Sequence, residues 1–530
     1  MAEAAVPAQE SSGDTRLAVL LAMAMFVLVV DTSLMNVSIS AVVSDLDATA
    51  SGVQSAIATE ALVSAAFILI GSKIGDLIGR KRAYVIGLSA YALGALSMTL
   101  AQSLVPIFIF WAVVGGLGAA LLLPAMQSLI HGNFSGPMQR KAYALVGAAA
   151  AIAAAVGPLL GGFVTTFLSW RVGFLCEVVI IAIVLFGSKL VHDVPYTGDK
   201  RVDVVGAILS AVGMGGVVLG ILVWQEGGEA VAALIALGLV SLGSLVWWLR
   251  KRKREGKPAL LDINLFSSKY FRLGISGQTL QQIALGGMMI ALPIYLQMVL
   301  EYNALEAGLS LAPLSLTMFA IALLAGRKAG DRSPSRIIFA GFLLLAVGVL
   351  VLIPIVPRAD SGLAMAIPLI VAGAGLGLLV SQLNNFTLSP IEEERVSEAA
   401  GVNSAGGSFG LSFGLAFSGA IMLATLSLAF THYADESDVL TGPQQEQVAD
   451  TLDENAEVMS NTDLEELLEG QRPAVQEEIL DINEDSRPIA LQVALLIPLG
   501  AALLGLFAAF RMTRLPDPKP SASAEMALGG

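Results

Sequence analysis

The stretch GSKIGDLIGRKR, residues 71–82, is a basic turn with three glycines between two long apolar segments. Its first half returns as GRKAGD, residues 326–331, so the pattern G-x-K-x-G-D occurs twice, 255 residues apart. The first long apolar segment begins near Leu17, and the same displacement gives Arg272, where another long apolar segment begins. Two copies at one offset predict a duplicated helical bundle with extra chain between the copies.

The composition excludes a water-soluble globular protein. Of the 530 residues, 55% are hydrophobic and only 14% are charged, which leaves too little polar surface to cover the chain. In hydrocarbon each backbone amide must be paired within its own segment, and the apolar runs are too long for barrel strands. The sequence therefore predicts an all-α polytopic membrane protein. The one cysteine, Cys176, excludes an intrachain disulfide.

Windows of about 20 apolar residues predict fourteen transmembrane helices. An even number of crossings places both termini on one side of the membrane. Lys and Arg decide which side, because 26 of the 30 basic residues lie in the tails and loops that share the side of the N-terminus. Both termini are therefore expected to be cytoplasmic. The predicted spans are 17–41, 53–74, 82–102, 104–128, 142–166, 171–191, 203–224, 229–249, 273–299, 306–325, 337–356, 362–385, 399–430 and 488–510.

The repeat assigns these spans to domains. Gly71 follows the second span and Gly326 follows the tenth, so the copies are eight helices apart. This shift predicts two six-helix bundles around a pocket at the membrane midplane, the architecture of transporters whose bundles rock about one site. The predicted domains are a cytoplasmic tail (1–16), an N-terminal bundle (17–191), two extra helices (192–250), a cytoplasmic linker (251–271), a C-terminal bundle (272–510) and a second cytoplasmic tail (511–530).

An acidic segment on the exterior side, residues 432–487, interrupts the C-terminal bundle. It holds 17 acidic and two basic residues, a balance of −15 within a total net charge of −13. Thr462 and Glu465 form a capping box there, and the pattern predicts two or three short amphipathic helices. We expect this acidic cap to be a solvated decoration, or to gather cations or contact an exterior partner.

Asp31 is the strongest candidate for a functional residue. It lies about 14 residues into the first span, roughly 21 Å along a helix, and therefore near the bilayer midplane. A carboxylate at that depth is costly unless it faces a pocket, is paired, or is neutralised by a proton. Asp31 is therefore predicted to couple transport to protons or to recognise a cationic substrate. A hydrogen bond that only packs helices is the alternative.

Two further acids and several amides lie in the predicted spans. Glu60 and Glu177 are each expected roughly 10 Å from the exterior surface, either as outer proton sites or as partly exposed interfacial residues, with Arg171 as a possible partner of Glu177. Intramembrane amides orient substrates or bond neighbouring helices. The candidate cavity residues are Asn36, Gln127, Gln278, Gln281, Gln282 and Tyr295.

These segments together resemble the fourteen-helix drug:proton antiporter branch of the major facilitator superfamily. VVDTSLMNVSIS, which contains Asp31, Thr32, Asn36 and Val37, is similar to the signature of its first span, and residues 71–82 to its cytoplasmic loop motif. Residues 295–313 and 401–414 resemble later segments of the branch. The antiporter motif G-P-x-x-G-G is present as Gly157, Pro158, Gly161 and Gly162.

The resemblance implies two structural roles and shows one departure. It implies that Asp76, Gly79, Arg80, Lys81 and the repeated Asp331 form a conformational latch, and that the G-P-x-x-G-G residues form a seam where the bundles pack closely. Drug:proton antiporters usually carry an arginine in the fourth span, where this chain has Ala112. The usual cationic partner for proton exchange is therefore missing, so Asp31 serves either protons or substrate.

The predicted function is secondary active export, by alternating access and proton antiport, of hydrophobic, cationic or amphiphilic compounds across a bacterial plasma membrane. No nucleotide-binding, metal or catalytic signature is present, so the energy source is expected to be a gradient. The expected partners are a small substrate, protons and membrane lipid, without a cofactor or nucleic acid. Two alternatives remain open: a lipid or lipid-like metabolite exporter of the same fold, and a membrane scaffold or receptor that does not transport.

Overall fold

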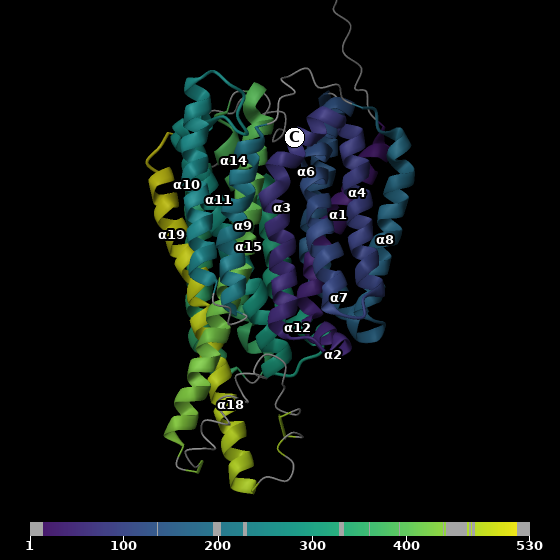
Figure 1. Ribbon diagram of the computed structural model, residues 1–530. Coiled ribbons are helices and arrows are strands. Elements are labelled where there is room, and N and C mark those ends of the chain that lie inside the picture. The colour runs from purple at the N-terminus through teal and green to yellow at the C-terminus, as the bar shows by residue number, and fades with distance from the viewer. Residues whose placement is uncertain are drawn as a thin grey trace, which may run out of the picture.

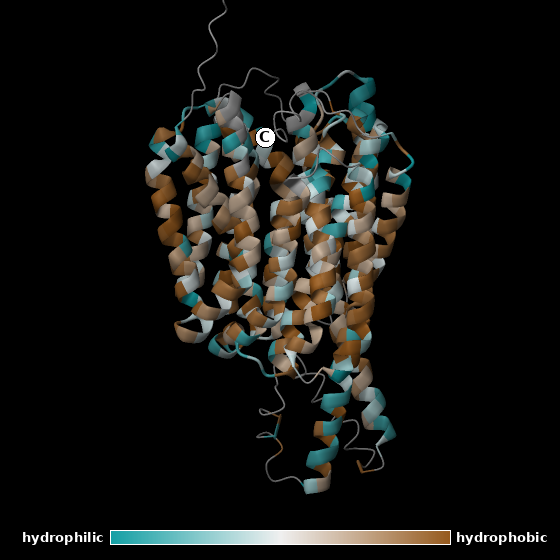
Figure 2. Ribbon diagram, turned by 180° about the vertical axis from the view of Figure 1, so that it is seen from behind, coloured by the Kyte–Doolittle hydropathy of each residue, from teal (hydrophilic) through white to brown (hydrophobic). Residues whose placement is uncertain are grey.

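The computed structural model describes residues 14–134, 136–193, 203–225, 230–327, 333–359, 361–391, 393–437, 439–440, 464–465, 468 and 472–516. Within these residues fourteen helical spans are long and apolar enough to cross a membrane, as the sequence predicts. Figure 1 shows them as an upright bundle of roughly parallel helices, and Figure 2 shows apolar residues along most of their length. Fourteen crossings place Asp14 and Pro516 on the same side.

The helices of the first half follow one another closely, and two segments depart from α geometry. The segment η1, inside the fourth membrane span, is a π-helix, a geometry that is common at functional sites, and η2 is a short 3-10 helix. The elements are α1 (Thr15–Val37), α2 (Ile39–Leu46), α3 (Ala50–Ile78), α4 (Arg80–Leu100), α5 (Leu104–Pro106), η1 (Ile107–Gly115), α6 (Gly116–Asn133), α7 (Gly136–Phe167), α8 (Trp170–Gly187), η2 (Ser188–Leu190), α9 (Val204–Gln225) and α10 (Val231–Arg254).

The second half is also helical, and it contains a second π-helix, η4. Its elements are η3 (Ile263–Ser267), α11 (Lys269–Ile294), η4 (Tyr295–Val299), α12 (Ala304–Arg327), α13 (Pro334–Ile355), η5 (Val356–Arg358), η6 (Gly362–Met365), α14 (Ala366–Leu388), α15 (Glu393–Glu436), α18 (Pro473–Ala494) and α19 (Leu496–Met512).

Helix packing groups these elements. In the first half α1 packs on α7 and α8, α3 packs on α6, and α4 packs on α6 and α8. In the second half α11 packs on α15 and α19, while α14 packs on α12 and α13. Helix α9 contacts both α3 and α15, and α10 packs mainly on α9. This packing is compatible with the predicted division into two six-helix bundles and two extra helices, which we propose as the domain organisation.

The last two spans are longer than predicted. Helix α15 covers 44 residues, and α18 begins at Pro473, well before the predicted start of the last span at 488. The C-terminal part of the acidic cap is therefore one continuous helix with the membrane span, and the prediction of separate short helices is wrong for residues 473–483. Helix α18 and the end of α15 project beyond the other helices (Figure 1). Thr462, and with it the predicted capping box, lies outside the described residues.

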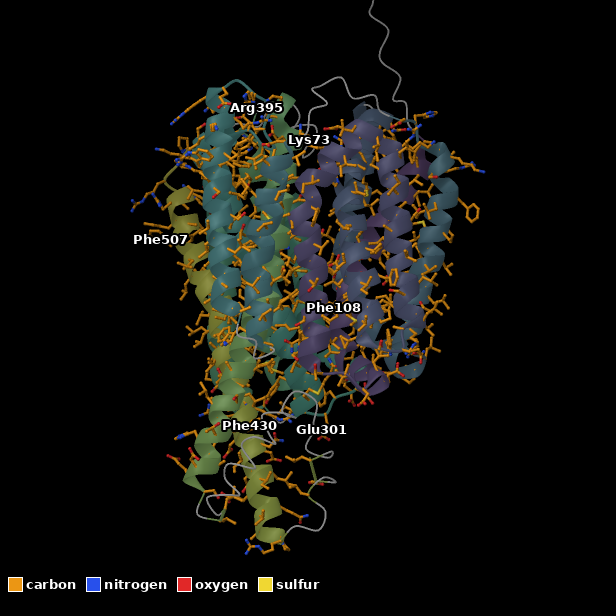
Figure 3. The ribbon with its side chains drawn as sticks, in the orientation of Figure 1. Lys73, Phe108, Glu301, Arg395, Phe430 and Phe507 are labelled. Atoms are coloured by element: carbon orange, nitrogen blue, oxygen red, sulfur yellow. The ribbon has the colours of Figure 1, made fainter. Side chains whose placement is uncertain are left out.

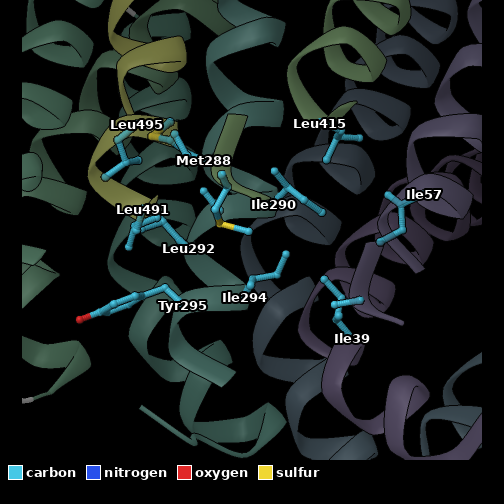
Figure 4. Packing of buried hydrophobic residues seen from close by; sticks show 14 of the residues in the cluster. Ile39, Ile57, Met288, Ile290, Leu292, Ile294, Tyr295, Leu415, Leu491 and Leu495 are labelled. Atoms are coloured by element: carbon cyan, nitrogen blue, oxygen red, sulfur yellow. The ribbon is translucent and has the colours of Figure 1, made fainter. Parts of the chain in front are cut away.

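The two bundles are joined in the exterior half of the molecule. The Ser40 backbone N–H and hydroxyl both donate to the Gln297 Oε1 atom, at 3.1 and 2.7 Å. The Leu305 N–H donates to the Thr166 hydroxyl at 3.0 Å. Buried apolar side chains join the bundles at the same level, where Ile39 and Ile57 lie opposite Ile290 and Ile294 (Figure 4). This arrangement closes the exterior side. Figure 3 shows basic residues Lys73 and Arg395 at the opposite end from Glu301.

Candidate functional site

Asp31 lies inside the N-terminal bundle and is fixed by two aromatic donors. Its side chain is 1% exposed. The Tyr91 hydroxyl, from α4, donates to one carboxyl oxygen. The Trp111 indole N–H, from the π-helix η1, lies 3.1 Å from both carboxyl oxygens. Neutral donors from two neighbouring helices thus satisfy the carboxyl group that the sequence predicts to be functional.

The π-helix explains how Trp111 reaches this position. A π-turn widens the helix and changes the direction of the side chains around it, which is why such turns are common at functional sites. The Trp111 ring packs edge-on against Phe174 of α8, with ring centroids 6.4 Å apart. This contact holds the indole N–H toward α1. No periodicity in the sequence marks Tyr91 or Trp111 as partners of Asp31, so neither residue is predictable as part of this site from the sequence.

Glu60 and Glu177 converge on the same region. Both side chains are buried, with Glu177 only 2% exposed, and both carboxyl groups act electrostatically on Asp31 and on Tyr91. The Glu177 carboxyl group faces Asp31 closely enough for the two acids to share a hydrogen bond when one of them carries a proton, and no other described group donates to it. We call Asp31, Glu60 and Glu177 the acid cluster.

The acid cluster corrects one part of the sequence analysis. The alternative in which Glu60 and Glu177 are partly exposed at the outer interface is wrong, because both are buried. The suggested pair between Glu177 and Arg171 is also wrong. The Arg171 guanidinium instead forms an ion pair with Asp45 and donates to the Ala101 carbonyl at 2.6 Å.

No cation accompanies the acid cluster in the described parts of the chain. The ion pairs there involve none of its three carboxyl groups. Ala112, at the position where the resemblance expects an arginine, is fully buried next to Trp111. The same residues also contain no group of three His, Cys, Asp or Glu side chains arranged to hold a metal ion. Three buried acids without a countercharge form a site suited to protons or to a cationic ligand.

The predicted cavity residues do not form one surface. The Asn36 amide donates to the Thr32 carbonyl at 2.9 Å and faces α11, where Met289 lies 4.0 Å away. The Tyr295 ring lies between apolar neighbours, and its hydroxyl donates to the Val356 carbonyl at 3.0 Å. Gln127 is exposed on α6. Their shared role in substrate binding stays a prediction.

The three glutamines of α11 lie together. Gln281 is buried and donates weakly to Gln282, at 3.4 Å, while its own carbonyl oxygen has no partner among the described residues. Gln278 and Gln282 are half-buried and lie beside Gly407 of α15. Gln297, which the sequence analysis did not select, is the amide that joins the bundles through Ser40.

The latch contacts described below lie inside the N-terminal bundle or beside its last helix. Gly79 has φ of +99°, a conformation that favours glycine, and it allows α4 to begin directly after α3. Arg80 forms an ion pair with Asp76. The Lys81 backbone N–H donates to Asp193 at 2.9 Å, and its ammonium group donates to the Val191 carbonyl at 2.8 Å. Asp331 lies outside the described residues. A latching role stays a prediction.

The G-P-x-x-G-G residues of α7 serve two different contacts. A Cβ on Gly157 would lie 2.6 Å from the Ser33 Cβ atom, and one on Gly161 would lie 2.9 Å from the Leu34 Cα atom, so these glycines admit α1 of the same bundle. A Cβ on Gly162 would lie 2.8 Å from the Leu305 Cα atom of α12, and Gly308 of α12 packs directly on the Pro158 carbonyl. Only this second pair of contacts joins the bundles.

Comparisons with known proteins identify the family of the chain. The model of the family described as Major Facilitator Superfamily matches residues 21–205 and 196–415. A Mycobacterium tuberculosis protein named Multidrug resistance protein Stp is 26% identical over 407 residues, covering 76% of this chain and 75% of its own length. The Puromycin resistance protein pur8 of Streptomyces alboniger is 29% identical over 405 residues, covering 73% of this chain and 78% of its own length.

Solved structures show the same fold. A bacterial homologue of the human lysosomal transporter Spinster, in an inward-facing conformation, has a TM-score of 0.62 at 12% identity and covers 96% of this chain and 99% of its own. A peptide transporter, POT, has a TM-score of 0.60 at 13% identity and covers 95% of this chain and 96% of its own. The chain therefore belongs to the Major Facilitator Superfamily, as a multi-pass transporter of the plasma membrane with fourteen transmembrane helices.

Proposed function

We propose that the protein exports hydrophobic, cationic or amphiphilic compounds in exchange for protons. The acid cluster is the observation that carries this proposal, because its three carboxyl groups are buried close together without a cation among the described residues. Relatives named for multidrug and puromycin resistance support export of small organic compounds. The predicted scaffold or receptor function has no support from this family.

We expect the acid cluster to be stable either when it is protonated or when it binds a cationic ligand. Burying several negative charges together is costly, so protons or a cationic ligand stabilise the cluster. The donors Tyr91 and Trp111 stabilise the ionised form of Asp31, since hydrogen bonds to a carboxylate are stronger than those to a neutral group. We infer that Asp31 gives up its proton on the cytoplasmic side and receives one when the bundles open to the exterior.

Movement between these states requires the exterior contacts to separate. Glycines line the contact between α7 and α12, Ser40 and Gln297 add hydrogen bonds, and apolar residues such as Ile39 and Ile290 pack beside them. Because these contacts join one bundle to the other, we infer that two rigid bundles part along this surface. The exterior-closed arrangement is one end of this proposed cycle. Alternating exposure of one site to the two sides follows from such a movement.

The test uses purified protein in vesicles with an imposed proton gradient. A lipophilic cation such as ethidium serves as substrate, and a pH-sensitive dye inside the vesicles reports proton movement. We expect Asp31→Asn to abolish both gradient-driven ethidium movement and the coupled proton flux. Asp47→Asn is the matched control, because Asp47 is exposed and has φ of 49°, a conformation that asparagine accepts well.

Gradient-driven transport by a folded Asp31→Asn protein at the wild-type rate would remove Asp31 from the mechanism. Ethidium movement without proton flux in the wild-type protein would refute proton coupling itself. A lipid or lipid-like substrate is the second candidate. It is favoured by Ala112, which leaves the acid cluster without the expected arginine, and by a pocket between the bundles that is lined mainly by apolar residues.

A further inference from the structure

A small pocket lies between the two bundles on the exterior side. None of the three residues of the acid cluster lines it. Its volume is about 30 Å³, which admits water but no organic molecule in the exterior-closed arrangement. Helix α3 of the N-terminal bundle forms one wall, and the end of α11, η4, α15 and α18 of the C-terminal bundle form the others. The residues used below are Gln54, Met298, Met422, Leu426, Arg487 and Leu491.

Gln54 contributes an unsatisfied amide to this pocket. Its side chain is 2% exposed, and neither its carbonyl oxygen nor its amide nitrogen has a hydrogen-bond partner among the described residues. A buried polar group without a partner destabilises the folded protein by about 1–3 kcal/mol. Such a group at a pocket wall is best explained by a polar ligand or water that it binds in another state of the cycle.

Arg487 contributes a positive charge to the same pocket. The side chain is 5% exposed, and its Nε atom donates to the Asn483 oxygen at 2.9 Å, while a terminal nitrogen donates to the Met298 carbonyl at 2.6 Å. These bonds hold the guanidinium group at the pocket wall. Glu301, which is exposed, acts on it electrostatically. An arginine at this depth disfavours cations and attracts carboxylate or phosphate groups.

The remaining walls are apolar. Met422 and Leu426 of α15 and Leu491 of α18 line the pocket. The site therefore combines one cation and one hydrogen-bonding amide with a surface suited to a hydrocarbon chain. Because Gln54 and Arg487 belong to different bundles, the pocket widens when the bundles separate on the exterior side.

We propose that this pocket binds the anionic head group, carboxylate or phosphate, of a single-chain amphiphile in the exterior-open state. Arg487 pairs with the anion, Gln54 donates a hydrogen bond to it, and the chain lies along α15 and α18. The proposal rests on the proposed export function and assigns a substrate class to it. Cationic compounds use the acid cluster instead.

The test measures equilibrium binding in nanodiscs made of zwitterionic lipid, without any gradient. The probes are laurate and lauryl phosphate, with dodecanol as the neutral control and dodecylamine as the cationic control. We expect Gln54→Leu and Arg487→Gln each to weaken binding of an anionic probe by about ten- to a hundredfold, the effect of losing one charged hydrogen bond. Dodecylamine binding is expected to be unchanged. The matched control is Gln102→Leu, at an exposed amide between α4 and α5.

Gln54→Leu removes no hydrogen bond within the described residues, so it keeps the test valid even if Arg487→Gln does not fold. The anion that binds more tightly identifies the head group, and either one supports the proposal. Equal wild-type binding of laurate and dodecanol, or wild-type laurate binding by Gln54→Leu, would overturn it. Asp31→Asn is expected to bind laurate normally, so loss of proton coupling and loss of this site are separable results.

Discussion

Tyr91→Phe tests the hydrogen bond that fixes Asp31. The substitution removes only the hydroxyl group that donates to the Asp31 carboxyl, while the buried ring stays in place. A hydrogen bond to a charged group is worth about 1.5–3 kcal/mol and one between neutral groups about 0.5–1.5 kcal/mol. We therefore expect Tyr91→Phe to lower the free energy of unfolding by about 1–3 kcal/mol and to slow proton-driven transport.

Tyr84→Phe is a matched control on the same helix. Tyr84 is as deeply buried as Tyr91, but its hydroxyl oxygen has no hydrogen-bond partner among the described residues. Removing an unsatisfied buried hydroxyl group is neutral or stabilising. The two substitutions are chemically identical and lie two turns apart on α4. Tyr91→Phe is expected to lower the free energy of unfolding, whereas Tyr84→Phe is expected to leave it unchanged or to raise it.

The assay is reversible unfolding in mixed micelles with increasing SDS, followed by tryptophan fluorescence and repeated in the Asp31→Asn background. There, Tyr91→Phe is expected to cost less, because an amide accepts a weaker hydrogen bond than a carboxylate. Equal stability changes for Tyr91→Phe and Tyr84→Phe would refute the reasoning. So would a full Tyr91→Phe cost that persists when Asp31 is replaced.

Two further predictions concern the exterior closure. Gly162→Leu is expected to abolish transport while leaving the protein folded in the membrane, because its Cβ would lie 2.8 Å from the Leu305 Cα atom of the other bundle. Gly147→Leu is the control and is expected to keep transport, because a Cβ at Gly147 would have no atom within 4 Å. Transport rates of both variants are measured in vesicles, and normal transport by Gly162→Leu would contradict the packing argument. Gln297→Leu removes the two hydrogen bonds to Ser40 and is expected to favour the exterior-open state by about threefold or more. The measurement is labelling from the exterior of a cysteine introduced at the buried interface residue Ile39, in a Cys176→Ala background; unchanged labelling would exclude a gating role for Gln297.

The sequence alone determined the class, the number of crossings and the family. Long apolar segments with few charges can only be satisfied as helices in a bilayer, and the distribution of Lys and Arg sets their orientation. The repeat of G-x-K-x-G-D and the position of Asp31 within its span were likewise readable, because both depend on distance along one chain. These features need no knowledge of which helices are neighbours.

Only the tertiary structure decided what surrounds Asp31 and which residues share a site. Tyr91, Trp111 and Glu177 come from three different helices, and the rotation of each helix about its axis, changed at Trp111 by a π-turn, determines whether their side chains meet. Arg487 and Gln54 are 433 positions apart in the sequence, and they line one pocket because the bundles close on the exterior side. Local sequence records depth in the membrane, but contacts between helices depend on packing that no single segment specifies.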